Sequence, residues 1–377
     1  MMLNDLNANN LRIAISPTIF RVQKEGGISR YFYRLILGLL SNSFSVYHGN
    51  IAPSSKYLNM LKETTSLTNS KSEAMIGNFL LDERIPLGWA PRSLKIWKPN
   101  IIHETYFSTK WFRSISGSTK KVITVYDLIE EKMNPIQDAK FRKRAALKLT
   151  DHVICISNAT RNDLIEIYDF PIERTSVVYL APYPMAISHN LDKKQFINDG
   201  RPFFLYVGAR GGYKNFKILV EAFSLFSNVE PDFHLITFGG GPFKEEELRH
   251  FSALSINSKI KNISGDDALL SIYYRSAVAL IYPSLMEGFG MPPLEAMQMG
   301  TLVIVSNCAA SVEILSGSSA VFFDPECKED LFEKMGIALQ SDDIVQNITK
   351  KNKIYSSNFT WDKCIAETIN VYNMILN

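Results

Sequence analysis

Two glutamates bracket a glycine-rich segment in the second half of the chain. Glu287 and Glu295 have seven residues between them, and four residues follow Glu287 directly: Gly288, Phe289, Gly290 and Met291. Backbone N–H groups at a glycine turn that opens a helix favour an anion, and flanking carboxylates can accept hydrogen bonds from sugar hydroxyls. The pattern therefore suits a nucleotide sugar, a diphosphate between two polyols. The alternative is an ordinary strand–helix connection with solvated glutamates.

The surrounding sequence supplies the elements that would hold this segment. The apolar run 277–283 predicts a buried strand. Pro292 and Pro293 fit the first turn of a helix, where no N–H donor is needed. Gly300 is placed to end that helix. The order is strand, glycine turn, helix N-terminus.

A second turn carries two cations. Residues 202–208 predict a strand and residues 216–226 a helix, and Arg210 and Lys214 lie in the glycine-containing loop between them. Arginine can bind a diphosphate bidentately, and lysine acts as a point charge. The alternative is two exposed cations in a turn. Beside the glutamate-flanked segment, the diphosphate clamp is the favoured interpretation.

Together these two turns resemble the donor-binding signature of the retaining glycosyltransferases of family 4. The resemblance covers nearly the whole chain, is strongest over residues 202–325, and is closest to the bacterial mannosyl-type transferases that build surface polysaccharides such as O-antigen. It implies the α/β GT-B fold, in which two Rossmann-like domains with parallel sheets face each other across a cleft. It also implies that Glu295 holds the ribose hydroxyls and Glu287 the sugar hydroxyls.

Repeated strand–helix units in both halves predict two parallel sheets. The best boundary follows residue 180, where a proline-containing stretch and the polar run 190–200 break the pattern. We expect an acceptor-side domain over residues 1–185 and a donor-binding domain over residues 198–358. In GT-B relatives the last helix, here within residues 360–377, crosses back to the first domain.

The first half contributes a glycine pair. Gly26 and Gly27 lie between a predicted strand, residues 11–16, and a predicted helix, residues 28–40. The family resemblance implies that this loop approaches the donor phosphates. A plain helix N-cap loop is the alternative.

Three polar residues at predicted strand ends are candidates for the acceptor side or the cleft. His103 lies near the end of the predicted short strand 101–104, as a core histidine or as a cleft residue. Tyr126 and Asp127 end the strand that begins at residue 121, at the sheet edge where ligands gather. Many family relatives have histidine where this chain has Tyr126, although tyrosine can also bind a sugar. Asp127 either orients an acceptor hydroxyl or caps the next turn.

Composition narrows the possible partners. The chain has 377 residues and a net charge of +3, so no nucleic-acid footprint is expected. Four scattered cysteines without a C-x-x-C pattern favour a reducing compartment. No apolar run approaches the ~18 residues of a membrane span, and residues 1–10 lack a signal-peptide core. We therefore expect a cytoplasmic protein.

A local basic run qualifies that expectation. It is either a solvated helix face or a contact with an anionic membrane on the inner face of the plasma membrane. Its cations are Lys140, Arg142, Lys143, Arg144 and Lys148.

We expect retaining transfer of a hexose, mannose-like by resemblance, from a GDP- or UDP-linked donor to a glycan or lipid-linked acceptor. Arg210, Lys214 and the helix N-terminus would stabilise the leaving diphosphate. No metal and no cofactor is expected, because no D-x-D stands at a credible strand end. A nucleotide-sugar epimerase of the same fold and a non-catalytic nucleotide-sugar-binding subunit are the competing interpretations.

Overall fold

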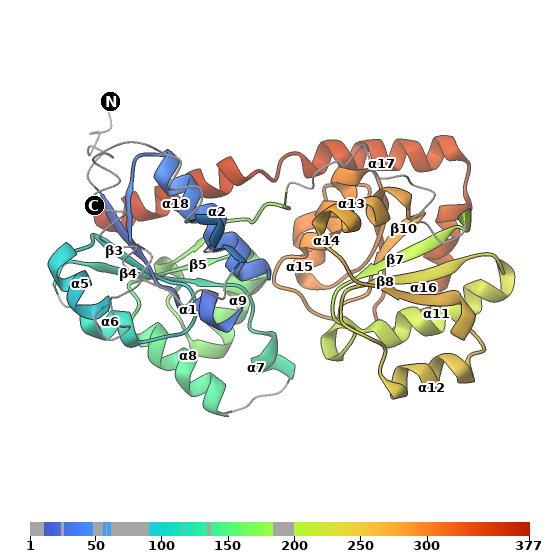
Figure 1. Ribbon diagram of the computed structural model, residues 1–377, viewed down its shortest axis with the longest axis horizontal. Coiled ribbons are helices and arrows are strands. Elements are labelled where there is room, and N and C mark those ends of the chain that lie inside the picture. The colour runs from blue at the N-terminus through green and yellow to red at the C-terminus, as the bar shows by residue number, and fades with distance from the viewer. Residues whose placement is uncertain are drawn as a thin grey trace. The chain divides into compact units, whose positions relative to one another are not determined.

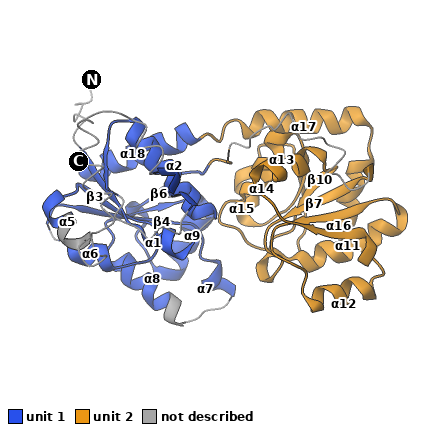
Figure 2. Cartoon of the chain, viewed as in Figure 1, with its two compact units in different colours: residues 1–180, 361–377 blue, residues 181–360 orange. Residues whose placement is uncertain are grey.

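The chain folds into two compact units, each built around one parallel sheet. The computed structural model describes residues 11–23, 26–47, 56–57, 59–61, 90–115, 117–133, 137–183 and 200–377. Unit 1 comprises residues 1–180 and 361–377, and unit 2 comprises residues 181–360 (Figure 2). Each sheet has six strands and is flanked by helices (Figure 1). The predicted α/β class with two parallel sheets is confirmed.

Unit 1 has the strand order β2-β1-β3-β4-β5-β6, and every pairing is parallel. Its strands are β1 (Arg12–Ile15), β2 (Ser45–Tyr47), β3 (Ile101–Glu104), β4 (Lys120–Val125), β5 (His152–Cys155) and β6 (Thr175–Val177). Its helices are α1 (Thr18–Val22), α2 (Gly27–Ser41), α5 (Ala90–Trp97), α6 (Lys110–Ser114), α7 (Ile129–Met133), α8 (Gln137–Leu149), α9 (Asn158–Tyr168) and α18 (Trp361–Leu376), with a 3₁₀ turn at Ile172–Arg174.

Unit 2 has the order β12-β11-β10-β7-β8-β9, again all parallel. Its strands are β7 (Phe203–Val207), β8 (His234–Phe238), β9 (Ile260–Ile263), β10 (Ala279–Tyr282), β11 (Leu302–Ser306) and β12 (Val321–Phe323). Its helices are α11 (Phe216–Val229), α12 (Glu245–Ala253), α13 (Asp267–Ser276), α14 (Met291–Met299), α15 (Ala309–Leu315), α16 (Lys328–Met335) and α17 (Asp342–Ser356), with 3₁₀ turns at Gly212–Lys214, Asn257–Lys259 and Gly336–Leu339.

The central strands are apolar on both faces because helices cover both sides of a parallel sheet. In unit 2 an aromatic cluster joins the sheet to α11: Phe226 meets Phe204 and Phe233 edge-on, with centroids 5.0 and 5.1 Å apart. Such contacts add to the burial energy of each ring. They give the loops at the carboxyl edge a rigid base.

The last helix, α18, packs within unit 1 against α2. Gly38 on α2 permits the close approach, since a Cβ there would lie 2.2 Å from the Ile365 side chain. The Tyr372 hydroxyl also lies 2.6 Å from Nδ1 of His103 on β3. Unit 1 is therefore completed by a segment that follows all of unit 2 in the sequence.

Candidate functional site

The strand order of unit 2 reverses between β7 and β10, the position at which open α/β sheets form a ligand-binding crevice. From β7 the chain proceeds to β8 and β9 on one side and returns to β10 on the other. In open α/β sheets, ligands bind at the carboxyl edge where the order reverses in this way. The loops that leave β7 and β10 are fastened together there, because the Leu285 N–H donates to the Tyr213 carbonyl at 2.8 Å.

The turn after β10 forms the N-terminus of α14. Gly290 is the N-cap and has φ +91°, a left-handed conformation that residues with a side chain rarely adopt. Pro292 and Pro293 lie in the first turn of the helix, and Gly300 ends it with φ +80°. The predicted helix boundaries are confirmed. The positive end of the α14 dipole therefore points toward the crevice.

Lys214 and Glu287 meet at this crevice. Lys214 Nζ lies 2.7 Å from Glu287 Oε1, and the two side chains are 18% and 9% exposed. Nζ also lies 3.5 Å from the Tyr282 hydroxyl and 5.4 Å from the centre of its ring. Burial and the Glu287 carboxylate raise the pKa of Tyr282 well above its ordinary value, so its phenol stays neutral. Two of the three residues expected to act in catalysis are thus in direct contact.

Glu295 is nearly buried inside α14, with 6% of the residue exposed. Its Oε2 accepts a hydrogen bond from the Tyr274 hydroxyl of α13 at 3.0 Å. Gly288 and Phe289 are also buried, and the Phe289 ring meets Phe359 edge-on at 6.1 Å. The glutamate-flanked segment is therefore anchored at both ends.

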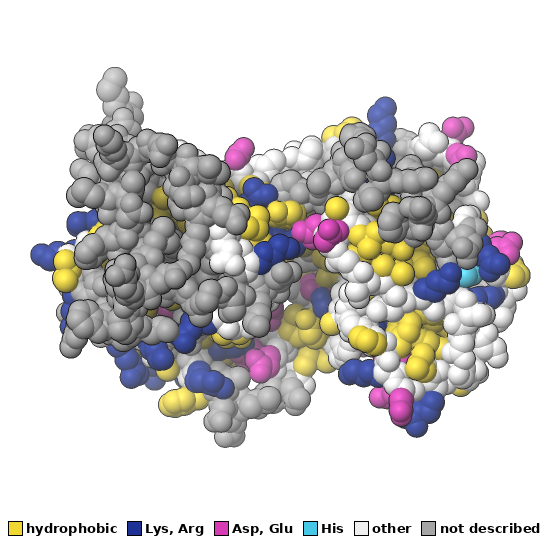
Figure 3. Space-filling model, in the orientation of Figure 1, with side chains coloured by type: hydrophobic (Ala, Val, Ile, Leu, Met, Phe, Trp, Pro, Cys, Tyr) yellow, Lys and Arg dark blue, Asp and Glu magenta, His cyan; other side chains and the backbone are white. Residues whose placement is uncertain are grey.

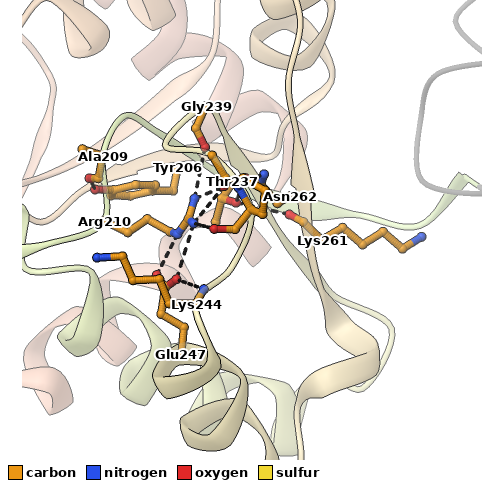
Figure 4. Close-up of polar contacts among 11 residues, drawn as sticks. Tyr206, Ala209, Arg210, Thr237, Gly239, Lys244, Glu247, Lys261 and Asn262 are labelled. Carbon is orange, nitrogen blue, oxygen red and sulfur yellow. Dashed lines mark hydrogen bonds and ion pairs between the residues drawn. The ribbon is translucent and has the colours of Figure 1, made fainter.

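Arg210 behaves differently from Lys214. Its side chain is only 4% exposed and pairs with Glu247 of α12 at 2.7 Å. Figure 4 shows the guanidinium turned toward the loop after β8, where it binds backbone carbonyls. This geometry does not test whether Arg210 contacts a ligand. Its expected role in the diphosphate clamp therefore stays a prediction.

The glycine pair of unit 1 lies at the start of α2. Gly26 is the N-cap in an extended conformation, and Gly27 opens the helix. The Gly26 carbonyl accepts from the Arg30 N–H at 3.0 Å and from the Ser29 hydroxyl at 3.1 Å. These contacts are those of a helix N-cap loop. An approach of this loop to donor phosphates stays a prediction.

His103 lies in the core of unit 1. Its Nδ1 lies 2.6 Å from the Tyr372 hydroxyl, its Nε2 lies 2.8 Å from the Thr124 hydroxyl, and the residue is fully buried. Burial lowers the pKa of His103 to about 3, so the ring is neutral. Of the two alternatives, the core histidine is the one that the structure supports.

Tyr126 and Asp127 also have structural surroundings. Tyr126 is 9% exposed, and its ring meets Tyr31 and Phe32 edge-on at 5.8 and 6.3 Å. Within the described residues its buried hydroxyl has no hydrogen-bond partner. Asp127 Oδ1 accepts from the Ile129 N–H at 3.3 Å and so caps α7. Neither arrangement requires an acceptor, and neither acceptor role is tested.

Two glycosyltransferase family models together match most of the chain. The family described as "Glycosyl transferases group 1" matches residues 188–355, and "Glycosyltransferase Family 4" matches residues 25–181. The chain belongs to glycosyltransferase family 4.

Two curated relatives of this family 4 chain are named as O-antigen chain mannosyltransferases. It is 26% identical over 233 residues to O-antigen chain mannosyltransferase B of Escherichia coli, covering 59% of this chain and 60% of the relative. It is 28% identical over 193 residues to O-antigen chain mannosyltransferase RfbU of Salmonella typhimurium, covering 50% of each. The chain thus spans about half to three-fifths of the length of these relatives.

Solved structures share the whole fold. A glycosyltransferase from Rickettsia africae superposes with a TM-score of 0.71 at 18% identity, covering 98% of this chain and 99% of that one. Anabaena Alr3699/HepE in complex with UDP-glucose also gives 0.71, at 16% identity, covering 96% of this chain and all of that one. These likenesses establish the GT-B fold.

Several residues of the family 4 chain escaped the sequence analysis. Tyr274 and Tyr282 each contact an expected site residue. In the sequence they lie in apolar segments whose pattern predicts only that they are core residues. Glu104 ends β3 at the strand-order reversal of unit 1, and its Oε1 accepts from the Ser16 hydroxyl at 2.7 Å. Its Oε2 is buried and has no partner in the part of the chain that the structure describes, and burial raises the pKa of Glu104 to about 7. The available sequence signal was the glutamate that ends the predicted short strand 101–104.

The described residues contain no group of three histidine, cysteine, aspartate or glutamate side chains that could hold a metal ion. Among them, no helix combines the length and the hydropathy needed to cross a bilayer.

Proposed function

We propose that the chain is a retaining, metal-independent hexosyltransferase of surface polysaccharide synthesis. It would move a hexose, with mannose favoured, from a GDP- or UDP-linked donor to a glycan or lipid-linked acceptor. The observation that carries the proposal is the Lys214–Glu287 pair, 2.7 Å apart, beside the N-terminus of α14 at the strand-order reversal of unit 2. The names of the two O-antigen mannosyltransferases and the UDP-glucose complex of the Anabaena protein support the donor and the pathway class.

In this proposal the diphosphate binds between Lys214 and the α14 N-terminus. A lysine ammonium has three donors, so Lys214 can bind a phosphate oxygen while it keeps Glu287 in place. Glu287 then accepts a hydrogen bond from a hydroxyl of the transferred sugar. Tyr274 fixes the carboxylate of Glu295, which would hold the ribose hydroxyls. These contacts orient the anomeric carbon toward the acceptor.

The chemical step breaks the bond between the anomeric carbon and the diphosphate oxygen. Its electron pair goes to that oxygen, where Lys214 and the α14 dipole stabilise the developing charge. The acceptor hydroxyl forms the new bond from the same face, so the anomeric configuration is retained. Its proton passes to a diphosphate oxygen, and the step needs no protein base and no metal ion.

Thermal unfolding in the presence of GDP- and UDP-hexoses tests the proposal. A donor present at about 100 times its Kd should add ~2.7 kcal/mol to the free energy of unfolding. The stabilising donor is then incubated with lipid-linked acceptors in the presence of a chelator, and the anomeric configuration of the product is read by NMR. Failure of every sugar nucleotide to stabilise the protein would contradict the proposal. Binding without transfer would indicate a nucleotide-sugar-binding subunit, and an isomerised donor an epimerase.

A further inference from the structure

The loop after β8 contains a glycine-rich turn whose backbone conformation needs stabilising contacts from outside the turn. Gly239, Gly240 and Gly241 have φ values of +83°, +71° and +75°. Three successive left-handed residues are available almost only to glycine, and glycine is also the residue with the greatest backbone freedom to lose. The turn at residues 239–242, here called the glycine turn, therefore depends on contacts from other elements.

Arg210 supplies most of those contacts (Figure 4). Its Nη1 donates to the Gly239 carbonyl at 3.1 Å, and its Nη2 donates to the carbonyls of Gly241 and Pro242 at 2.9 and 2.8 Å. A Cβ on Gly240 would lie 2.8 Å from the same Nη1 and 2.7 Å from the Gly208 carbonyl. The glycine turn is thus wrapped closely around the guanidinium.

Glu247 holds the guanidinium from the other side. Its Oε1 accepts from Arg210 Nε at 2.7 Å, while its Oε2 accepts from the Lys244 N–H at 2.7 Å. The Arg210 guanidinium also lies 4.8 Å from the centre of the Phe243 ring. All three guanidinium nitrogens are engaged by protein atoms, and the side chain is 4% exposed. A phosphate could reach Arg210 only if some of these contacts broke.

We infer that Arg210 is a positioning residue: it fixes the glycine turn and does not itself contact the diphosphate. The inference rests on the proposed function, because the nucleotide is the ligand that the turn would meet. The carbonyls of Gly239 and Gly241 are drawn onto Arg210. In the described part of the chain, no acceptor contacts the N–H groups of Gly240 and Gly241. The fixed turn therefore offers two backbone donors to an oxygen of the bound nucleotide, in the loop that follows β8, the strand paired with β7.

Replacing Glu247 with glutamine distinguishes direct phosphate binding by Arg210 from positioning of the glycine turn, because the two predict opposite changes in nucleotide affinity. If Arg210 bound phosphate directly, Glu247→Gln would release the guanidinium and remove a negative charge, so nucleotide affinity would rise or stay unchanged. If Arg210 positions the turn, the same substitution loosens it, and affinity falls. Arg210→Lys keeps the positive charge but loses the planar fork that reaches the carbonyls and the carboxylate together.

The experiment measures the Kd of UDP and of GDP by calorimetry for wild type, Arg210→Lys, Glu247→Gln and the double variant. Each single variant should weaken the nucleotide that wild type binds by roughly tenfold. The double variant should bind the nucleotide no more weakly than the weaker-binding single variant does, because both changes release the same turn. Glu246→Gln is the matched control, since it removes the same charge from an exposed position in the first turn of the same helix. Unchanged or tighter binding by Glu247→Gln would overturn the inference.

Hydrogen exchange of the unliganded proteins gives a readout that needs no nucleotide. Amides of residues 239–244 should exchange faster in Arg210→Lys and Glu247→Gln than in wild type and Glu246→Gln, with the rest of unit 2 unchanged. Equal exchange in all four proteins would overturn the inference. If wild type binds neither UDP nor GDP, the proposed function fails, whereas the exchange data still decide whether Arg210 holds the turn.

Discussion

Lys214 is the residue on which the proposed chemistry depends most directly. Replacing it with alanine removes the cation beside the leaving group, and turnover should fall by about 10²-fold or more. The change also leaves Glu287, 9% exposed, without its ion-pair partner. Steady-state transfer rates should therefore be measured beside a melting curve for each protein.

Lys217→Ala is the control for Lys214. Lys217 lies one helical turn further on, is 76% exposed and approaches Glu221 only to 3.8 Å. Its removal should leave the transfer rate unchanged, since an exposed pair of this kind contributes little. A Lys214→Ala protein with a normal rate would exclude Lys214 from the leaving-group site.

Glu104 predicts a pH dependence of stability with a definite sign. Its pKa is about 7 in the folded chain, above the ordinary value of 4.5. Below pH 4.5 both states carry the proton, so its stabilising contribution is complete. Between pH 4.5 and 7 the unfolded state loses the proton first, and the contribution, at most ~3 kcal/mol, is lost as the pH rises.

Glu104→Gln tests that sign because glutamine does not titrate. The pKa of His103 falls from 6.5 to about 3 on burial, so this residue contributes stability that increases with pH between those values. Removing the opposing effect of Glu104 should make the free energy of unfolding rise more steeply between pH 5 and 7 than in wild type. Chemical denaturation at several pH values measures the free energy of unfolding of both proteins. Parallel pH profiles would contradict the inference that the Glu104 carboxyl is buried and protonated.

At the scale of elements, the sequence predicted best what is determined locally. The strand at 277–283 and the helix ended by Gly300 follow from an apolar run, two prolines and a glycine within 25 residues, and the structure contains β10 and α14 there. The surroundings of Arg210 and His103 were not predictable in this way. The hydrogen-bond partners of Arg210 are 29 to 52 positions away, and the His103 partner Tyr372 is 269 positions away. Such partners depend on strand order, which periodicity does not specify.

The basic helix α8 shows the same limit. Lys143 belongs to its cationic run, yet the side chain is buried and pairs with Glu131 at 2.8 Å. The outward side carries Phe141, which is 74% exposed, together with Arg142 and Arg144. In Figure 3, Lys and Arg side chains gather along the edge of unit 1 on which α8 lies. An exposed aromatic ring between cations suits an anionic membrane surface.

Membrane binding is therefore a prediction about α8. Arg142→Gln with Arg144→Gln should reduce co-sedimentation with phosphatidylserine-containing vesicles by roughly tenfold or more at low salt, at about 1 kcal/mol per cation. Lys350→Gln with Lys351→Gln removes equal charge from exposed positions on α17 and is the control. Equal losses in both proteins would indicate a general charge effect, and no loss in either would return α8 to the solvated-face interpretation.

At the scale of the whole molecule, the chain order ties unit 1 to its last segment. Residues 361–377 return to unit 1 after unit 2 is complete, and α18 buries Cys364, Ile365, Val371 and Tyr372 there. Each buried apolar side chain of this size contributes about 1.5–3 kcal/mol. Against a typical domain stability of 5–15 kcal/mol, the helix represents a large share. Unit 1 should not hold its native structure without it.

Deleting residues 361–377 should therefore unfold unit 1 and spare unit 2, whose sheet and covering helices lie within residues 181–360. Hydrogen exchange distinguishes the two units, with β3 and β4 losing protection while β10 and β11 keep theirs.

A milder test is Tyr372→Phe, which removes only the hydroxyl bonded to His103. It should lower the free energy of unfolding by about 1–3 kcal/mol, because a buried ring nitrogen loses its partner. Tyr355→Phe is the matched control in unit 2, where the hydroxyl donates to the Ile314 carbonyl. It should lower the protection of unit 2 alone. If the truncated protein kept β3 and β4 protected, unit 1 would be stable without α18, and the dependence argued from its buried face would be wrong.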